Sequence, residues 1–194
     1  NAYQRWDSPL DRRYPTAEQV DADLELLSGI TDRIRSYSSS ELPELPALAA
    51  KHGLRLTAGV WLSADEANNR REVESIKIAA NDSDSIERVV VGNESLLRGE
   101  LTPRQLIEYL DELRYTLPVP VSTAEPWHVW FRYPELANHV DFITVHLLPF
   151  WEGVPAEEAI GHAMARLESL RKRFPNRKIV IGEIGWPSQG DRFE

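Results

Sequence analysis

Short apolar runs recur along the chain, and a stretch with helical periodicity separates each run from the next. The runs are rich in Val, Ile and Leu, which is typical of parallel strands that are buried on both faces. This pattern predicts six strands, at 32–37, 54–62, 87–94, 119–127, 141–148 and 178–186. The alternation of strand and helix indicates βα units around a parallel sheet.

The segments between the strands carry apolar residues at helical spacing. Two stripes are expected to cover the sheet: Leu106, Ile107, Leu110, Leu113 and Leu117, and then Ala159, Ile160, Ala163, Met164, Leu167 and Leu170. Two segments have the form of capping boxes that open helices, Thr16-Ala17-Glu18-Gln19 and Thr102-Pro103-Arg104-Gln105. Helices are therefore predicted to begin near residues 17 and 103.

The repeat predicts an α/β fold, a TIM (β/α)8 barrel present as an incomplete barrel of about six βα units. A helix over about 17–29 implies a strand before Asn1, and a whole barrel takes about 250 residues, so the first and eighth strands are expected to be missing. Residues 1–194 are interpreted as one catalytic barrel domain, truncated at both ends. The open side should expose sheet edges and apolar residues at 24–27 and 167–170, which favours self-association.

Composition narrows the classes of partner. The 194 residues have 42% hydrophobic and 27% charged content, as in globular proteins, and a formal net charge of -9. A chain with this net negative charge cannot neutralise phosphates by charge alone, so neither nucleic acid nor an anionic membrane is expected as a partner. No apolar run approaches the ~20 residues of a spanning helix, so no membrane contact is expected from this segment. Cysteine is absent.

Polar residues inside the apolar runs indicate where chemistry lies. Alternation along a strand places these sets on common faces: Arg33, Arg35 and Tyr37; Val90, Gly92 and Glu94; Phe142, Thr144 and His146; Ile179, Ile181 and Glu183. If those faces point inward, their polar members converge on the mouth of the barrel, where barrel enzymes have their active sites.

Glu94 and Glu183 each end a strongly apolar run. Two facing carboxyl groups suit glycoside hydrolysis, in which one protonates the leaving oxygen and the other attacks or activates water. The alternative is that both are structural or exposed. The five histidines form neither an HxH nor an HExxH pair, so no metal and no cofactor is expected.

Two segments resemble the signature segments of glycoside hydrolase family 17, retaining enzymes that act on β-1,3-glucan: Val91-Gly92-Asn93-Glu94 and Ile181-Gly182-Glu183-Ile184-Gly185-Trp186-Pro187-Ser188. Three further segments are similar to the family: 35–37, 57–62 and 145–152. The similarity is greatest to the bacterial branch, whose domains also occur in membrane-bound cyclic β-glucan synthases. It implies a β-glucan substrate and a periplasmic or cell-envelope location, which includes the option of a membrane-anchored protein.

The resemblance implies that Glu94 is the acid/base and Glu183 the nucleophile that forms a covalent glucosyl-enzyme. Their carboxyl groups are then expected about 5 to 5.5 Å apart, and the charge of Glu183 is expected to raise the pKa of Glu94. Arg35 and Tyr37 would hold Glu183 ionised and oriented. Asn93 would contact the sugar 2-hydroxyl.

For other residues, two interpretations stay open. His146 bonds the nucleophile or a sugar hydroxyl, or it is a satisfied core residue. Glu125 binds sugar hydroxyls or pairs with an arginine. The tryptophans near strand ends form sugar platforms or cap the barrel core: Trp61, Trp127, Trp130, Trp151 and Trp186. A basic group near a helix C-terminus is interpreted as a solvated face: Arg166, Arg171, Lys172 and Arg173.

Two functions from different classes remain. The first is a retaining β-1,3-glucan enzyme, acting as endo-hydrolase or as glucanosyltransferase, with Trp127, Trp130 and Trp151 as acceptor platforms that favour transfer. The second is a glucan-binding module without turnover, because a barrel without two strands could hold its carboxylates too loosely. Intact Glu94 and Glu183 favour the first.

Overall fold

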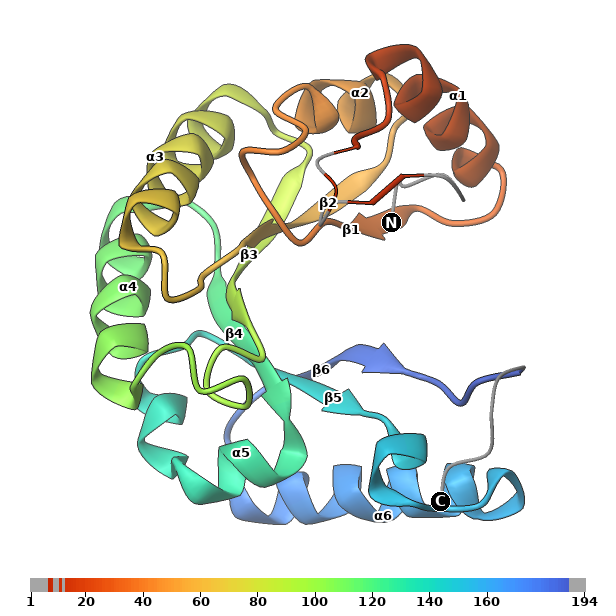
Figure 1. The fold of residues 1–194 in the computed structure, drawn as a ribbon, viewed down its shortest axis with the longest axis vertical. Helices are drawn as coiled ribbons and strands as arrows, with labels where there is room; N and C mark the ends of the chain where they lie inside the picture. The colour runs from red at the N-terminus through yellow and green to blue at the C-terminus, as the bar shows by residue number, and fades with distance from the viewer. Residues whose placement is uncertain (1–6, 9–10, 12, 189–194) are drawn as a thin grey trace.

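The computed structural model describes residues 7–8, 11 and 13–188. Its core is one sheet of six parallel strands in the order β1-β2-β3-β4-β5-β6. The sheet curls, and the helices lie along its outer side (Figure 1). The predicted open barrel of six βα units is confirmed.

The elements follow the predicted order. The strands are β1 Arg33–Arg35, β2 Arg55–Val60, β3 Ile86–Asn93, β4 Val121–Pro126, β5 Ile143–Leu147 and β6 Ile179–Ile184. The α-helices are α1 Ala17–Ser28, α2 Leu45–Lys51, α3 Glu66–Asp82, α4 Pro103–Thr116, α5 Trp127–Arg132 and α6 Ala156–Arg173. Two 3-10 helices are η2 Pro134–Asn138 and η3 Pro149–Glu152.

Both predicted capping boxes form. The Thr16 hydroxyl accepts the backbone N–H of Gln19, and the Thr102 hydroxyl accepts that of Gln105, each at 3.3 Å. Each glutamine side chain in turn accepts the backbone N–H of its threonine. These reciprocal bonds satisfy N–H groups that a helix cannot use internally, so α1 and α4 begin where the sequence predicted.

The predicted apolar stripes are only partly correct. Helix α4 buries Leu106, Leu110 and Leu113 as expected. On α6, by contrast, Ile160 is 80% exposed and Met164 is 52% exposed. The face of α6 that packs on the sheet is narrower than predicted and consists of Ala159, Ala163, Leu167 and Leu170.

The sheet does not close in the part of the chain that the structure describes, because β1 pairs only with β2 and β6 only with β5. Ile181 and Ile184 on β6 are 38% and 60% exposed. On the helices beside the edges, Leu24, Leu167 and Leu170 are buried, contrary to expectation, whereas Leu26 is 69% exposed, as expected. Self-association through this side stays a prediction. No described helix is both long and apolar enough to cross a membrane.

Two register shifts correct the predicted alternation of faces. Between β5 and β6, Val145 pairs with Ile181 and His146 pairs with Glu183, so Gly182 is an extra residue. A side chain at Gly182 would meet Arg35 and Thr144, which places Gly182 inward, next to Glu183. Ile179 instead packs against the core under the helices. The bulge, rather than a common face with Ile179 and Ile181, turns Glu183 inward.

The second shift lies on β3, between Val90 and Asn93. Gly92 has a φ of 78°, and a side chain there would meet Leu106 of α4, so Gly92 faces the helix layer rather than the site. Asn93 points inward, where it bonds Arg35. Glu94 follows with a φ of 56°, a left-handed conformation that is unfavourable for a residue other than glycine. This turn directs its carboxyl back into the site.

Candidate active site

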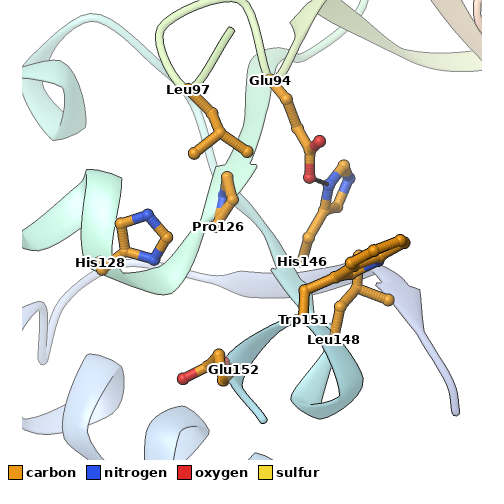
Figure 2. A pocket seen from close by; sticks show the side chains of 8 residues that line it. All are labelled: Glu94, Leu97, Pro126, His128, His146, Leu148, Trp151 and Glu152. Carbon is orange, nitrogen blue, oxygen red and sulfur yellow. Dashed lines mark hydrogen bonds and ion pairs between the residues drawn. The ribbon is translucent and has the colours of Figure 1, made fainter. Parts of the chain in front are cut away.

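One buried histidine brings the two glutamates together. The His146 side chain, on β5, is 0% exposed. Its Nδ1 lies 2.7 Å from Glu94 Oε1, and its Nε2 lies 3.5 Å from Glu183 Oε1. Figure 2 shows the contact with Glu94 from the side of the adjoining pocket. Residues from β3, β5 and β6 therefore converge at the carboxyl ends of their strands, and His146 is part of this group rather than of the apolar core.

The neighbours of His146 fix its tautomer. Arg35 Nη1 lies 3.4 Å from His146 Nε2. Because a guanidinium can only donate, Nε2 accepts this bond and the proton resides on Nδ1. Nδ1–H then donates to Glu94.

This bond determines the charge of Glu94 in the free site. The hydrogen bond from His146 lowers the pKa of Glu94 below its ordinary value of 4.5, and it outweighs the partial burial that acts in the opposite direction. The expectation of a raised pKa is therefore wrong for the free protein. The physical reason is that a donor aimed at a carboxylate stabilises its charged form.

Replacing His146 by Ala is expected to move the pH dependence of any Glu94-dependent activity. Removing the donor raises the pKa of Glu94, so the acid form persists to higher pH and the basic limb of kcat/KM shifts upward in pH. The control is His139→Ala, since His139 bonds Asp111 on the exterior. A basic limb that stays where it is in His146→Ala would contradict this assignment.

Glu183 is held from two directions. The Tyr37 hydroxyl donates to Glu183 Oε1 at 2.9 Å, and Arg35 Nη1 lies 3.6 Å from the same oxygen. Burial raises the pKa of Tyr37 to about 12, so its phenol keeps the proton that it donates. Both contacts hold the Glu183 carboxyl at a fixed position.

Arg35 also connects the two signature segments. Its Nη2 donates to Asn93 Oδ1 at 2.8 Å and its Nη1 to the Gly182 carbonyl at 2.9 Å. Because the Asn93 oxygen accepts from Arg35, the amide nitrogen is left to donate elsewhere. One guanidinium thus orders a residue next to each glutamate.

Two glycines permit this close packing. A Cβ at Gly182 would lie 2.7 Å from the Thr144 side chain and 3.0 Å from Arg35 Nη1. A Cβ at Gly59 would lie within 2.6 Å of the Tyr37 backbone, at 2.4 Å from its carbonyl carbon. Any larger residue at either position would displace a group that holds Glu183.

A pocket of about 360 Å³ opens beside Glu94. Figure 2 shows its lining: Glu94, Leu97, Pro126, His128, His146, Leu148, Trp151 and Glu152. Leu97, His128 and Glu152 had no predicted role, because nothing in their spacing marks them. Glu94 lines this pocket and Glu183 does not, so the pocket extends from the Glu94 side of the site.

The tryptophans differ in their surroundings. Trp151 is 69% exposed and lines the pocket, and Trp186 is 41% exposed with its indole against Phe150. Trp130 is fully buried, and its indole N–H donates to the Thr144 carbonyl at 3.0 Å. A sugar cannot stack on Trp130, so its interpretation as a platform is wrong.

Two tryptophans at strand ends are partly covered by arginines. The Arg166 guanidinium lies 4.2 Å from the Trp127 ring centroid, and the Trp127 indole N–H donates to Glu152. Arg166 therefore lies against an aromatic ring rather than on the predicted solvated face, because a guanidinium stacks well on indole. Arg98 covers Trp61 in the same way at 4.5 Å.

Glu125 is turned away from the site. Its residue is 0% exposed, and it accepts the backbone N–H groups of Leu96 and Leu97. Contact with sugar hydroxyls is therefore ruled out in this conformation. The alternation of side chains along β4 could have predicted this burial, because Glu125 shares a face with Val121, which packs in the core under the helices. Within the described residues, no group of three or more His, Asp or Glu side chains is arranged to hold a metal ion.

Comparison with known protein families identifies the family of this chain. The family model of the BtgE/BtgC glycoside hydrolase domain matches residues 2–194. The chain belongs to this family. The resemblance to glycoside hydrolase family 17 is confirmed.

Curated relatives of this glycoside hydrolase domain are longer proteins. The probable glucan endo-1,3-beta-glucosidase btgC of Aspergillus flavus is 27% identical over 94% of this chain and 29% of its own length. The glucan 1,3-beta-glucosidase of Schizosaccharomyces pombe is 28% identical over 89% of this chain and 60% of its own length. This chain therefore spans less than two thirds of either relative. Both are fungal, so the expected affinity to the bacterial branch is not supported.

A solved structure has the same fold. An active-site mutant of the Rhizomucor miehei beta-1,3-glucanosyltransferase, in complex with laminaritriose, superposes with a TM-score of 0.84. It is 25% identical and is matched over 93% of this chain and 70% of that one.

Proposed function

We propose that this glycoside hydrolase domain is a retaining enzyme on β-1,3-glucan, with Glu94 as acid/base and Glu183 as nucleophile. The observation that carries the proposal is the convergence of both carboxyls at His146: Glu94 Oε1 is hydrogen-bonded to Nδ1 at 2.7 Å, and Glu183 Oε1 lies 3.5 Å from Nε2. Relatives named as glucan glucosidases and a neighbour that binds laminaritriose support the substrate class.

The geometry suits a double displacement. Glu183, oriented by Tyr37 and Arg35, attacks the anomeric carbon while Glu94, in its protonated form, gives its proton to the departing glycosidic oxygen. A water or sugar hydroxyl then gives its proton to Glu94 and attacks the same carbon, which releases Glu183. The free amide nitrogen of Asn93 suits a donor to the 2-hydroxyl. A retaining mechanism needs a carboxyl separation of about 5 to 5.5 Å, and for Glu94 and Glu183 this separation stays a prediction.

The pocket beside Glu94 favours transfer over hydrolysis. In a retaining mechanism, both the leaving group and the acceptor exchange a proton with the acid/base. A pocket that includes Glu94 and not Glu183 therefore suits an acceptor sugar, and exposed Trp151 offers it a flat apolar surface. The alternative, a glucan-binding module without turnover, lacks any such explanation for the paired carboxylates.

Mass spectrometry of products from laminari-oligosaccharides distinguishes these functions. Products longer than the substrate indicate transfer. A mixture in which every product is shorter than the substrate indicates hydrolysis. Binding without any product, by a protein shown to be folded, would overturn the enzymatic proposal in favour of the binding module.

Replacing Trp151 by Ala is expected to lower the ratio of transfer to hydrolysis about five- to tenfold, because aromatic stacking of this kind is worth about 1 kcal/mol. Water needs no platform, so attack of water on the glucosyl-enzyme should change little. Tyr115→Ala, at a side chain that is 93% exposed on α4, is the matched control. An unchanged ratio in Trp151→Ala would show that the acceptor binds elsewhere.

A further inference from the structure

A buried carboxylate that the proposed chemistry does not use lies against the loop that follows Glu94. Glu125, on β4, is 0% exposed. Its Oε1 accepts the backbone N–H of Leu96 at 2.8 Å, and its Oε2 accepts that of Leu97 at 3.3 Å. Burying a carboxyl group is costly unless it is hydrogen-bonded. Both oxygens are thus committed to the loop that begins at Glu94.

This loop begins with an unfavourable backbone conformation. Glu94 has a φ of 56°, and a residue other than glycine keeps such a conformation only where its surroundings enforce it. The Glu94 N–H donates to the Ala124 carbonyl at 2.7 Å. Ala124 and Glu125 are consecutive residues of β4. Together they bind the loop at the N–H groups of Glu94, Leu96 and Leu97.

We infer that Glu125 is a positioning residue that fixes Glu94 for proton transfer to the leaving group. The inference rests on the proposed role of Glu94 as acid/base. The charged groups that interact with Glu125 are Glu94 and Arg98, and burial raises the pKa of Glu125 to about 7. Arg98, four residues after Glu94, also donates to the carbonyls of Asn93 and Leu62, so it ties the same loop to the end of β3 and to the segment after β2.

The test compares two substrates in the Glu125→Gln variant. Glutamine keeps one acceptor oxygen and turns an NH2 donor toward a backbone N–H, which releases one anchor. A laminari-oligosaccharide needs a proton on its leaving oxygen, whereas 2,4-dinitrophenyl β-laminaribioside needs little acid assistance. We expect kcat/KM to fall about ten- to a hundredfold for the oligosaccharide and only a few-fold for the aryl glycoside.

Glu72→Gln is the matched control. Glu72, on α3, is also a buried carboxylate that binds a loop: it is 1% exposed and accepts the N–H groups of Ser39 at 2.8 Å and Trp61 at 3.1 Å. That loop follows Tyr37, which bonds Glu183, so any loss should affect both substrates alike. An equal loss on both substrates in Glu125→Gln would overturn the inference, and so would unchanged activity.

Two further variants distinguish failure of the proposed function from failure of the positioning role alone. Glu94→Ala must itself show the selective loss on the oligosaccharide; without it, the proposed function fails. If Glu94→Ala shows the selective loss and Glu125→Gln does not, only the positioning role fails. Should Glu125→Gln not fold, Glu125→Asp retains the carboxylate but shortens its reach, and it must show the same selective loss for the inference to stand.

Discussion

Replacing Glu183 by Ala is expected to reduce turnover of β-1,3-glucan by about 10⁴-fold or more, because the variant lacks the proposed nucleophile. Azide or formate should enter the space left by the side chain and restore turnover of an activated aryl glycoside. The rescued product should have inverted anomeric configuration, since a single displacement replaces two. Product analysis by NMR checks this.

Glu158→Ala is the control for this experiment, because Glu158 is an exposed glutamate on α6 that does not line the pocket beside Glu94. Its activity should match that of the unmodified protein. If azide instead rescued Glu94→Ala with inverted product and left Glu183→Ala inactive, the roles of the two glutamates would be exchanged.

Replacing Arg35 by Met should lower kcat/KM about 10²- to 10³-fold. The variant loses the cation beside Glu183, the donor to Asn93 and the donor to His146, and a hydrogen bond to a charged group is worth about 1.5 to 3 kcal/mol. Arg35→Lys should recover little, because an ammonium cannot reach several acceptors in one plane as a guanidinium does. Steady-state kinetics on laminari-oligosaccharides measures both variants.

Arg88→Met controls for the loss of an arginine inside the curled sheet. Arg88, on β3, lies over the Phe142 ring at 5.6 Å and pairs with Glu87. It has no bond to Glu94 or Glu183 in the described structure, so activity should persist. Equal losses in Arg35→Met and Arg88→Met would mean that Arg35 acts through packing alone, and thermal unfolding of both variants would show it.

The sequence by itself determined the elements of this protein and the end of the sheet where its polar groups meet. Apolar runs and helical stripes are local patterns, and the capping boxes at Thr16 and Thr102 involve residues three apart, so neither depends on distant parts of the chain. Because parallel strands present their carboxyl ends at one edge, Glu94, His146 and Glu183 could be placed at the same mouth before any contact was known.

The tertiary structure alone decided how the side chains reach that mouth. Simple alternation put Glu94 with Gly92 and Glu183 with Ile181, whereas bulges on β3 and β6 reverse the faces just before each glutamate. A bulge depends on the pairing of two strands and on the space around a glycine, here the contacts of Gly182 with Arg35 and Thr144. Neither is encoded in the spacing of residues along one strand.

Burial and charge state were likewise decided by distant neighbours. Glu125, Trp130 and Trp151 all lie at or beyond strand ends in the sequence, yet the first two are fully buried and the third is 69% exposed. The pKa of Glu94 is lowered because His146, 52 residues away along the chain, donates to it. Desolvation and hydrogen bonding depend on which groups surround a side chain in space, and only the folded chain brings those groups together.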